Sequence, residues 1–290
     1  MSEMHAMLNG ELLSAHSADD DAAALAQFNR LGLFGDGLFE TMFVNRRNIH
    51  LRDYHMQRLA KGLRVLQFET GLAQVESEID ALLASLKQSN SQHRLKLVIS
   101  RGTGRSGYSP KGCQQQRLLV AEPFAFVQSP PASIAASKLR LASQPLLAGL
   151  KHCNRLEQVL AKIEQETSGR DDLLLCSQHG NVVEAISSNL FVLEGQTLLT
   201  PSLTDCGVAG VMRKFVMRDV APRLGLAVSE LEFPVQRLAA SDGVLLTNSL
   251  QGVRLVSTCT LPAGEQVQFA GKKILRDLQA VVVESMLAAT

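Results

Sequence analysis

The sequence predicts an α+β fold divided into two domains. Its 290 residues are enough for one large domain or for two of ordinary size. In both halves of the chain, short apolar runs bounded by turn residues predict strands, and apolar residues at helical spacing predict helices. Between the halves lies VQSPPAS at 127–133, where two adjacent prolines mark the best linker candidate. We therefore expect a smaller N-terminal domain over 1–128 and a larger C-terminal domain over 129–290.

The N-terminal half is expected to contain several strands and two amphipathic helices. LFETMFV at 38–44 has the composition of a strand and ends at a turn. Residues 49–67 form a helical pattern with an apolar stripe, and Asp53 is expected to cap its start. The acidic, alanine-rich stretch at 17–28 is expected to form an exposed short helix or a loop. The other elements expected in this half are a helix over 75–87 and strands over 94–102 and 117–126.

The C-terminal half is expected to combine strands with three helices. The first helix follows Asn154, which together with Glu157 resembles a capping box. Apolar residues at helical spacing predict a buried stripe on this helix, made of Leu156, Val159, Leu160 and Ile163. The other expected elements are strands over 139–142 and 172–176, three short strands within 180–201, a helix over 211–224, a strand–turn–strand over 243–257 and a helix over 271–287.

Composition and charge argue against several classes of function. The formal net charge of +1 gives no electrostatic basis for binding nucleic acid or an anionic membrane. No apolar run approaches the ~20 residues of a membrane-spanning helix, and the N-terminal sequence lacks the pattern of a signal peptide. The five cysteines are odd in number, widely spaced and without a CxxC pair, which argues against a disulfide framework and a structural zinc site. We therefore expect a cytoplasmic protein that binds no metal.

Lys151 is the first candidate for chemistry, because it lies about one turn ahead of the helix that follows Asn154. The positive end of the helix dipole and the apolar residues near Lys151 are both expected to lower its pKa. A lysine that is neutral near pH 7 is able to form a Schiff base with a carbonyl compound. The alternative is a surface lysine that keeps its charge in water.

Three further positions suit a carbonyl cofactor that has a phosphate group and a ring nitrogen. Gly210 precedes a helix whose first backbone N–H groups are open to a phosphate, and Arg58 is able to bind a phosphate through two hydrogen bonds. Glu184 lies among apolar strand residues, where a carboxylate would stabilise a protonated ring nitrogen. Each position also has a structural alternative, namely a glycine turn, a solvated arginine and an edge-strand glutamate that faces water.

Together and in this order, these residues and their motifs resemble a known family. The motifs are FGDGLFETMFV (34–44), HMQRL (55–59), ISRGTGRSGYS (99–109), AGLKHCNRLEQVLA (148–161), VVEAISSNLFVL (182–193), TPSLTDCGVAGVMR (200–213) and VLLTNSLQGV (244–253). They are similar to the pyridoxal-phosphate enzymes of fold type IV, which include the branched-chain and D-amino-acid aminotransferases. Within that family the chain most resembles the 4-amino-4-deoxychorismate lyases. The resemblance covers about residues 8–256 and implies the two-domain α+β fold of type IV.

The resemblance implies pyridoxal 5′-phosphate as the cofactor and gives roles to individual residues. Lys151 would hold the cofactor covalently and move protons. Glu184 would pair with the pyridine nitrogen, and Arg58 would bind the phosphate. Further phosphate contacts would come from Gly210, from the backbone of Val211 and Met212, and from Asn248.

The resemblance also implies contacts to a substrate and to a second chain. Thr41 matches a threonine that the lyases place near the substrate, so it joins Lys151 as a catalytic candidate. Arg101 and Arg105 are the candidates for binding substrate carboxylates, and Tyr108 is a further substrate-binding candidate. Family members are homodimers with the site in the cleft between the two domains, so a homodimer is expected here.

The chain departs from the lyase pattern at Arg105 and at Glu40, and the departure at Glu40 leaves a second activity open. Arg105 stands one position earlier than the corresponding arginine of the lyases, and Glu40 stands where some lyases have threonine and aminotransferases often have glutamate. The first hypothesis is a lyase that converts 4-amino-4-deoxychorismate to 4-aminobenzoate and pyruvate in folate biosynthesis. The second is an aminotransferase of the same fold that acts on D-amino or branched-chain amino acids. The third is a non-catalytic module that binds a phosphate ligand.

Overall fold

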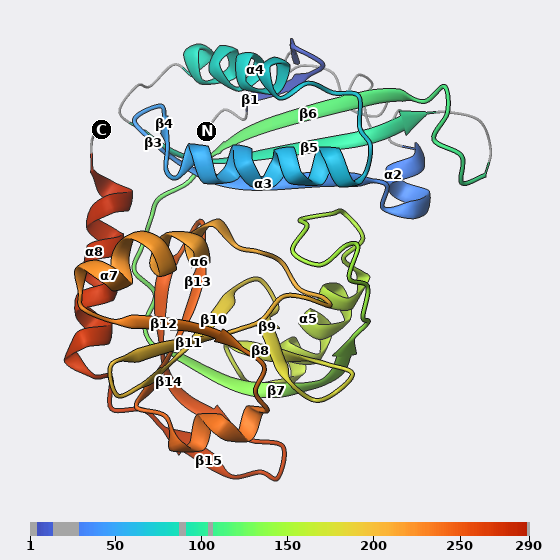
Figure 1. Ribbon diagram of the computed structural model, residues 1–290. Coiled ribbons are helices and arrows are strands. Elements are labelled where there is room, and N and C mark those ends of the chain that lie inside the picture. The colour runs from blue at the N-terminus through green and yellow to red at the C-terminus, as the bar shows by residue number, and fades with distance from the viewer. Residues whose placement is uncertain (1–4, 14–28, 87–90, 104–106, 289–290) are drawn as a thin grey trace. The chain divides into compact units, whose positions relative to one another are not determined.

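The chain divides into two compact units. The computed structural model describes residues 5–13, 29–86, 91–103 and 107–288 (Figure 1). Of these residues, those up to Phe126 form unit 1 together with the segment Leu150–Arg155, which contains the candidate lysine. Val127–Gly149 and Leu156–Ala288 form unit 2. The domain boundary placed between residues 128 and 129 stays a prediction.

Unit 1 is built on a sheet that has six antiparallel strands within its described residues, in the order β2-β1-β6-β5-β3-β4. The strands are β1 (His5–Leu8), β2 (Glu11–Leu13), β3 (Gly37–Asn45), β4 (Asn48–Ile49), β5 (Gln92–Thr103) and β6 (Gln114–Pro123). The pairing of β3 with β5 runs from Gly37↔Ser100 to Asn45↔Gln92 without a shift in register. The acidic stretch at 17–28 lies outside the described residues.

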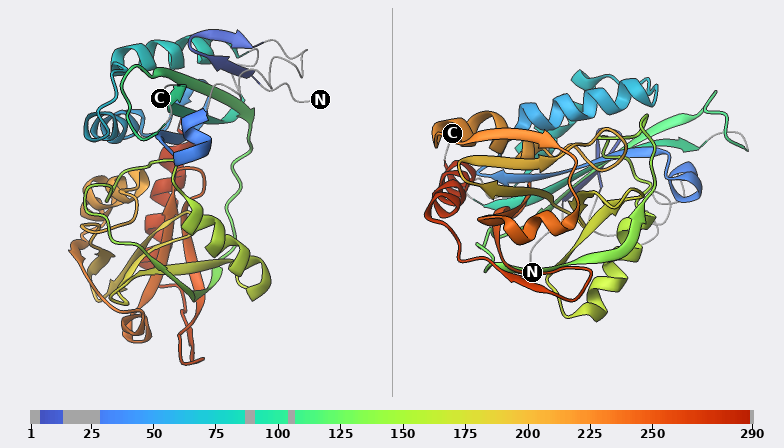
Figure 2. Two further views of the ribbon diagram at one scale, coloured as in Figure 1. Left: turned by 90° about the vertical axis from the view of Figure 1, so that its right-hand side faces the viewer. Right: turned by 60° about the horizontal axis from the view of Figure 1, so that its bottom comes forward.

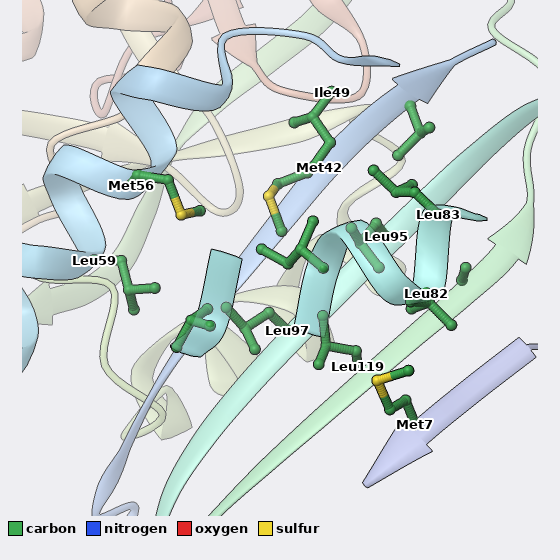
Figure 3. Close-up of a cluster of buried hydrophobic side chains, with 14 of the residues drawn as sticks. Met7, Met42, Ile49, Met56, Leu59, Leu82, Leu83, Leu95, Leu97 and Leu119 are labelled. Atoms are coloured by element: carbon green, nitrogen blue, oxygen red, sulfur yellow. The ribbon is translucent and has the colours of Figure 1, made fainter. Parts of the chain in front are cut away.

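Two helices, α3 (Arg52–Val65) and α4 (Leu72–Ser85), pack on one face of this sheet, and a short helix α2 (Asn29–Phe34) precedes β3. Figure 3 shows the core between them, in which helix side chains meet strand side chains. The labelled core residues are Met56 and Leu59 of α3, Leu82 and Leu83 of α4, and Met7, Met42, Ile49, Leu95, Leu97 and Leu119 of the strands. Because side chains alternate along a strand, the neighbours of Met42 in sequence belong to the opposite face.

Helix α3 confirms the predicted helix but begins differently. Its first residue, Arg52, follows Leu51, which has a left-handed conformation with a φ of 58°, and no side-chain hydrogen bond caps this end. Asp53 lies inside the first turn, so the prediction that it caps the helix is wrong. The buried stripe also contains a polar residue, His55, whose side chain is fully buried.

Unit 2 contains a sheet of nine strands within its described residues, in the order β12-β11-β10-β13-β14-β7-β8-β9, with β15 paired to β14. The sheet curls, because β9 at one end of this order contacts β10 and β11 near the other end. The strands are β7 (Ala132–Leu141), β8 (Asp172–Ser177), β9 (Val182–Ala185), β10 (Asn189–Glu194), β11 (Thr197–Pro201), β12 (Ala227–Leu231), β13 (Gly243–Asn248), β14 (Gly252–Thr260) and β15 (Gln266–Gln268). The predicted strands at 180–201 and 243–257 are confirmed.

The helices of unit 2 lie against different strands. Helix α5 (Leu156–Ser168) runs beside β7 and β8, and helix α8 (Lys273–Leu287) packs on β14 (Figure 2). The predicted helix at 211–224 is present as α6 (Val211–Phe215), a π-helical turn (Val216–Val220) and α7 (Ala221–Arg223) in succession. A short 3₁₀ helix at Val235–Ala240 precedes β13.

Helix α5 is present, but the side of it that was predicted to be buried is exposed. It begins at Leu156, and the Glu157 carboxylate accepts a hydrogen bond from the Ala142 N–H at 2.7 Å, so the capping box with Asn154 is wrong. The stripe predicted to be buried is exposed instead, with exposed fractions of 65% for Leu156, 51% for Val159, 51% for Leu160 and 56% for Ile163.

The polar side of α5 faces the sheet, and this is the physical reason why its apolar side is exposed. Glu164 accepts hydrogen bonds from the Ser137 hydroxyl and the Lys138 N–H of β7, and Gln165 donates to the carbonyl of Arg170 in the connection to β8. Ala161, the buried residue of α5, lies about 140° around the helix from Leu156 at 3.6 residues per turn. Hydrogen bonds to the sheet, rather than apolar burial, therefore set how α5 is rotated.

In the part of the chain that the structure describes, no helix has the length and apolar character needed to cross a membrane.

Candidate active site

The Lys151 segment extends the unit 1 sheet at the free edge of β3. The Phe39 N–H donates to the Lys151 carbonyl, and the Cys153 N–H donates to the Gly37 carbonyl, both at 2.9 Å. Leu38 and His152 stand opposite each other between these two bonds in an antiparallel bridge. This pairing attaches the lysine to a strand more than 100 residues earlier in the chain.

The register of this pairing decides which side chains lie beside Lys151. Residues directly opposite each other in an antiparallel pair share a face, so Lys151 and Phe39 point the same way. The Lys151 Nζ accordingly lies 4.3 Å from the centre of the Phe39 ring, in the range of a cation–π contact. Thr41, two residues further along β3, shares this face, which we call the Thr41 face. The structure thus brings both predicted catalytic residues to one face of one sheet.

A buried ionic cluster occupies the opposite face, where α3 packs. The Glu40 carboxylate, 1% exposed, accepts hydrogen bonds from the Arg58 guanidinium, with Nε to Oε1 at 2.8 Å. His55 Nδ1 lies 2.6 Å from the second oxygen of Glu40. Arg58, the predicted phosphate ligand, is therefore bound to a carboxylate on the α3 side, and its contact with a phosphate stays a prediction.

Burial and the contacts within this cluster determine the pKa values of Glu40 and His55. Burial raises the pKa of Glu40, but the Arg58 charge, the neighbouring His55 and the hydrogen bonds from both residues outweigh it and lower that pKa to about 2. Burial lowers the pKa of His55 despite the neighbouring Glu40 carboxylate. A carboxylate only accepts hydrogen bonds, so Nδ1 of neutral His55 donates to Glu40 and Nε2 is left as an acceptor. This Nε2 is buried and has no hydrogen-bond partner among the described residues.

Glu184 occupies a comparable buried position in unit 2. It lies on β9 and is 4% exposed, which excludes the alternative of an edge glutamate in water. The Val208 N–H donates to its Oε2 at 2.8 Å, and the Gln158 amide donates to its Oε1 at 3.4 Å. These neutral donors hold the carboxylate in place, and its pairing with a ring nitrogen stays a prediction.

The loop beside Glu184 leads directly into the glycine predicted to precede the phosphate site. The Asn189 amide donates to the Val208 carbonyl at 2.8 Å, which ties the loop to the start of β10. A Cβ on Gly210 would lie only 1.9 Å from Asn189 Oδ1, so glycine is required for this close approach. Helix α6 then begins at Val211, followed by Met212, as the sequence predicts.

Asn248 joins the same region from the end of β13. Its amide donates to the Ser188 hydroxyl at 3.0 Å, and its Oδ1 accepts hydrogen bonds from the N–H groups of Leu250 and Gln251. The Ser188 carbonyl accepts the Ala185 N–H at 2.7 Å and so closes the turn after the Glu184 strand. Unit 2 thus gathers Glu184, Gly210 and Asn248 around the connection between β9 and β10.

Arg101, predicted to bind a substrate carboxylate, contacts the protein instead. It is 6% exposed, and its guanidinium donates to the carbonyls of Leu66 and Gln67 and to the Asp36 carboxylate. Its charge also lies 3.9 Å from the centre of the Phe68 ring. These contacts anchor the end of α3 to β5, and they give no support to a substrate contact.

The other two predicted substrate residues follow β5 in the sequence, where the described residues resume at a turn that contains Gly107 and Tyr108. Arg105 lies outside the described residues, so its contact with a carboxylate stays a prediction. Tyr108 is 85% exposed, and its ring centre lies 5.2 Å from that of Phe34. The Arg30 guanidinium donates to the carbonyls of Gly107 and Tyr108, which fixes the backbone of this turn.

Several polar residues in and beside these candidate sites were not predicted from the sequence. A signal was present for each of them, because each interrupts an apolar pattern at a position where the period predicts burial or sheet. The residues are His55 in the α3 stripe, Lys96 in the LKLVIS strand, and Ser188 and Asn189 at the start of NLFVL.

Comparisons with known proteins identify a family model and relatives that cover most of the chain. The family model described as amino-transferase class IV matches residues 37–259. An aminodeoxychorismate lyase of Vibrio harveyi is 33% identical over 253 residues, which cover 85% of this chain and 91% of the relative. The crystal structure of a 4-amino-4-deoxychorismate lyase from Pseudomonas aeruginosa superposes with a TM-score of 0.82 at 33% identity, and covers 98% of this chain and 100% of that one.

A more distant structure shares the fold alone. A hypothetical aminotransferase from Mycobacterium tuberculosis, solved in its PLP-bound form, has a TM-score of 0.75 at 21% identity and covers 98% of this chain and 99% of that one. The family model spans most of the chain and includes the candidate residues from Thr41 to Asn248. The chain therefore belongs to the class IV aminotransferase family, as its motifs predicted.

Proposed function

We propose that this protein is a pyridoxal-phosphate-dependent lyase that converts 4-amino-4-deoxychorismate to 4-aminobenzoate and pyruvate. The observation that carries the proposal is the likeness to two proteins named as that lyase, at 33% identity and over most of the chain. The position of Lys151 on the Thr41 face supports it, because a lyase of this kind needs an amine beside the substrate.

The described residues fit the cofactor that the family implies. Lys151 has a primary amine at the Phe39 ring to hold an aldehyde, and Glu184 has a buried carboxylate for a ring nitrogen. The close approach at Gly210 is followed directly by α6, whose first backbone N–H groups would bind a phosphate. When bound, pyridoxal phosphate would supply an electron sink.

The chain's own residues would then bind the substrate and move one proton. Lys151 would take the proton from the amine-bearing carbon, with Thr41 beside it on the same face. The bond between the ring and the enolpyruvyl oxygen then breaks, and the carbocycle becomes aromatic. The released enolpyruvate takes up a proton at carbon and becomes pyruvate. The atoms of 4-aminobenzoate and pyruvate add up to those of the substrate, so no oxidant or reductant is needed.

The contacts of Glu40 bear on the competing aminotransferase. Glu40 was the residue that favoured this activity in the sequence, because aminotransferases often have glutamate there. Its carboxylate is bound to Arg58 and His55 on the α3 side of the sheet, opposite to the Thr41 face. A glutamate in this position therefore belongs to the buried cluster and does not by itself indicate an amino-acid substrate.

The deciding experiment supplies the purified protein, with pyridoxal phosphate added, with 4-amino-4-deoxychorismate. We expect formation of 4-aminobenzoate and pyruvate in equal amounts. In parallel the protein is mixed with D-alanine or a branched-chain amino acid and a keto acid acceptor. Amino transfer to the keto acid, without any 4-aminobenzoate in the first assay, would establish the aminotransferase instead.

We also propose that the protein is a homodimer that works in the cytoplasm. The outward apolar stripe of α5 supports the dimer, because its four apolar residues are exposed in the single chain and a second copy of the chain would bury them. Each such side chain contributes about 1.5–3 kcal/mol when it is fully buried. All five cysteines are free, which suits a reducing compartment.

The dimer is testable by charges placed on α5. The double variant Leu160→Asp, Ile163→Asp is expected to elute and scatter light as a monomer, whereas the wild type behaves as a dimer. Circular dichroism should stay unchanged, because both side chains are exposed in the single chain. Val127→Asp, at an exposed apolar residue outside α5, is the matched control and should remain a dimer. A dimeric double variant would show that α5 is not the contact surface.

A further inference from the structure

We propose that Lys96 binds a carboxylate of the substrate on the Thr41 face. This inference rests on the proposed function, because it assigns a residue to the substrate of that reaction. Strand register, electrostatic coupling and the pairing of the neighbouring cations support it independently of one another.

The register of β3 and β5 puts Lys96 directly opposite Thr41. Residues in direct opposition share a face and have Cβ atoms about 5 Å apart. Lys96 therefore extends from the same face as Thr41, Phe39 and, through the edge pairing, Lys151. A lysine side chain with four methylene groups is long enough to reach over a ligand held beside any of these residues.

Electrostatics independently link Lys96 to the lysine segment. Burial raises the pKa of the Cys153 thiol to about 11, while the charges of Arg155, Lys96 and Lys151 act in the opposite direction. Cys153 stands opposite Gly37 at the same sheet edge, so its side chain also belongs to the Thr41 face. Both amines thus act on one thiol.

The other cations on the strands of unit 1 already have acidic partners. Arg94 pairs with Glu122, and Arg117 pairs with Glu78. Arg101 pairs with Asp36 and with two backbone carbonyls.

Lys96 differs from these arginines, because it is exposed and makes no hydrogen bond or ion pair with any described residue. Its charge is therefore available to a ligand, and its exposure means that no desolvation of a buried ammonium has been needed.

The chemistry of the substrate calls for such a cation. 4-Amino-4-deoxychorismate has two carboxylates, and Arg101, one of the arginines predicted to bind them, contacts Asp36 and backbone carbonyls instead. A hydrogen bond between an ammonium and a carboxylate is stronger than one between neutral groups. Its loss is expected to weaken substrate binding roughly 10- to 100-fold. The lysine side chain is flexible, which also suits release of the carboxylate when the aromatic product leaves.

The test compares Lys96→Met with Lys96→Arg and with Lys61→Met. Lys61 is exposed on α3, so the same substitution there removes a charge from unit 1 without touching the Thr41 face. We expect Lys96→Met to raise the KM for 4-amino-4-deoxychorismate roughly 10- to 100-fold with little change in kcat. Lys96→Arg should recover most of the loss, and Lys61→Met should behave as the wild type.

A binding measurement separates this inference from the proposed function. Chorismate has the same two carboxylates but no amine, so calorimetry with it measures carboxylate recognition without turnover. We expect Lys96→Met to weaken chorismate binding by the same factor as KM, and added salt to weaken wild-type binding more than variant binding. If the wild type forms 4-aminobenzoate while Lys96→Met keeps the wild-type KM and chorismate affinity, Lys96 does not bind substrate. If the wild type forms no 4-aminobenzoate, the proposed function itself fails.

Discussion

Replacing Lys151 with alanine is expected to lower the rate of 4-aminobenzoate formation by roughly 10⁴-fold, the upper end of what one general acid–base group contributes. The variant would lose both the amine that we propose holds the cofactor and the base that we propose moves the proton. It should also lose the visible absorbance of the cofactor-loaded protein, because alanine has no amine to bond to the aldehyde. Steady-state kinetics and an absorbance spectrum measure the two effects on one sample.

The location of the covalent bond provides the stricter check. Borohydride reduction followed by peptide mapping should place the pyridoxyl label on Lys151 of the wild type. Lys138→Ala is the matched control, because Lys138 is exposed on β7 and belongs to none of the candidate site residues. A label on another lysine, or full activity in Lys151→Ala, would overturn both the assigned role and the reaction built on it.

Replacing Glu40 with glutamine is expected to destabilise the protein by about 3–5 kcal/mol at pH 7, the usual cost of removing one partner from a buried ion pair. The variant removes the charged acceptor of the His55 N–H, which is fully buried, and one charged acceptor of the Arg58 guanidinium, whose side chain is only 8% exposed. Urea unfolding followed by circular dichroism measures the loss. The matched control is Glu122→Gln, which breaks the exposed pair with Arg94 in the same sheet and should cost less than about 1 kcal/mol.

The pH dependence of this effect has a definite sign. The folded pKa of Glu40 is about 2 against an ordinary value of 4.5, so the ionised form is favoured in the folded protein. The resulting stability, about 3 kcal/mol, is fully present above pH 4.5 and is lost as the pH falls from 4.5 toward 2. The difference between wild type and Glu40→Gln should therefore shrink over this interval. A difference that stays constant from pH 7 to pH 3 would show that the carboxylate charge is not what stabilises the cluster.

Local sequence patterns were enough to predict the elements that carry the site. The strand at 38–44, the strand–turn–strand at 243–257 and the helix after Gly210 each follow from side-chain period and turn residues over fewer than twenty positions. The ends of helices were predicted less well, as Asp53 and Asn154 show. A cap depends on where the chain enters the helix, and that path is fixed by packing rather than by the capping residue alone.

The sequence did not predict which side of α5 faces the sheet, nor did it predict the partners of the arginines. Apolar period marks which residues of a helix share a side, but it does not say whether that side meets the sheet or another chain. Arg101 and Arg58 likewise look available in the sequence, because their partners Asp36 and Glu40 stand 65 and 18 positions away. Only the completed sheet brings such groups within hydrogen-bond distance.

The sequence by itself determined the family, the mixed fold and the candidate lysine, because all three depend on short motifs whose residues are neighbours in the chain. The tertiary structure decided that Lys151, Phe39, Thr41 and Lys96 share one face while Glu40 and Arg58 share the other. That choice depends on register between strands far apart in sequence, where a slip of one residue would exchange the two faces.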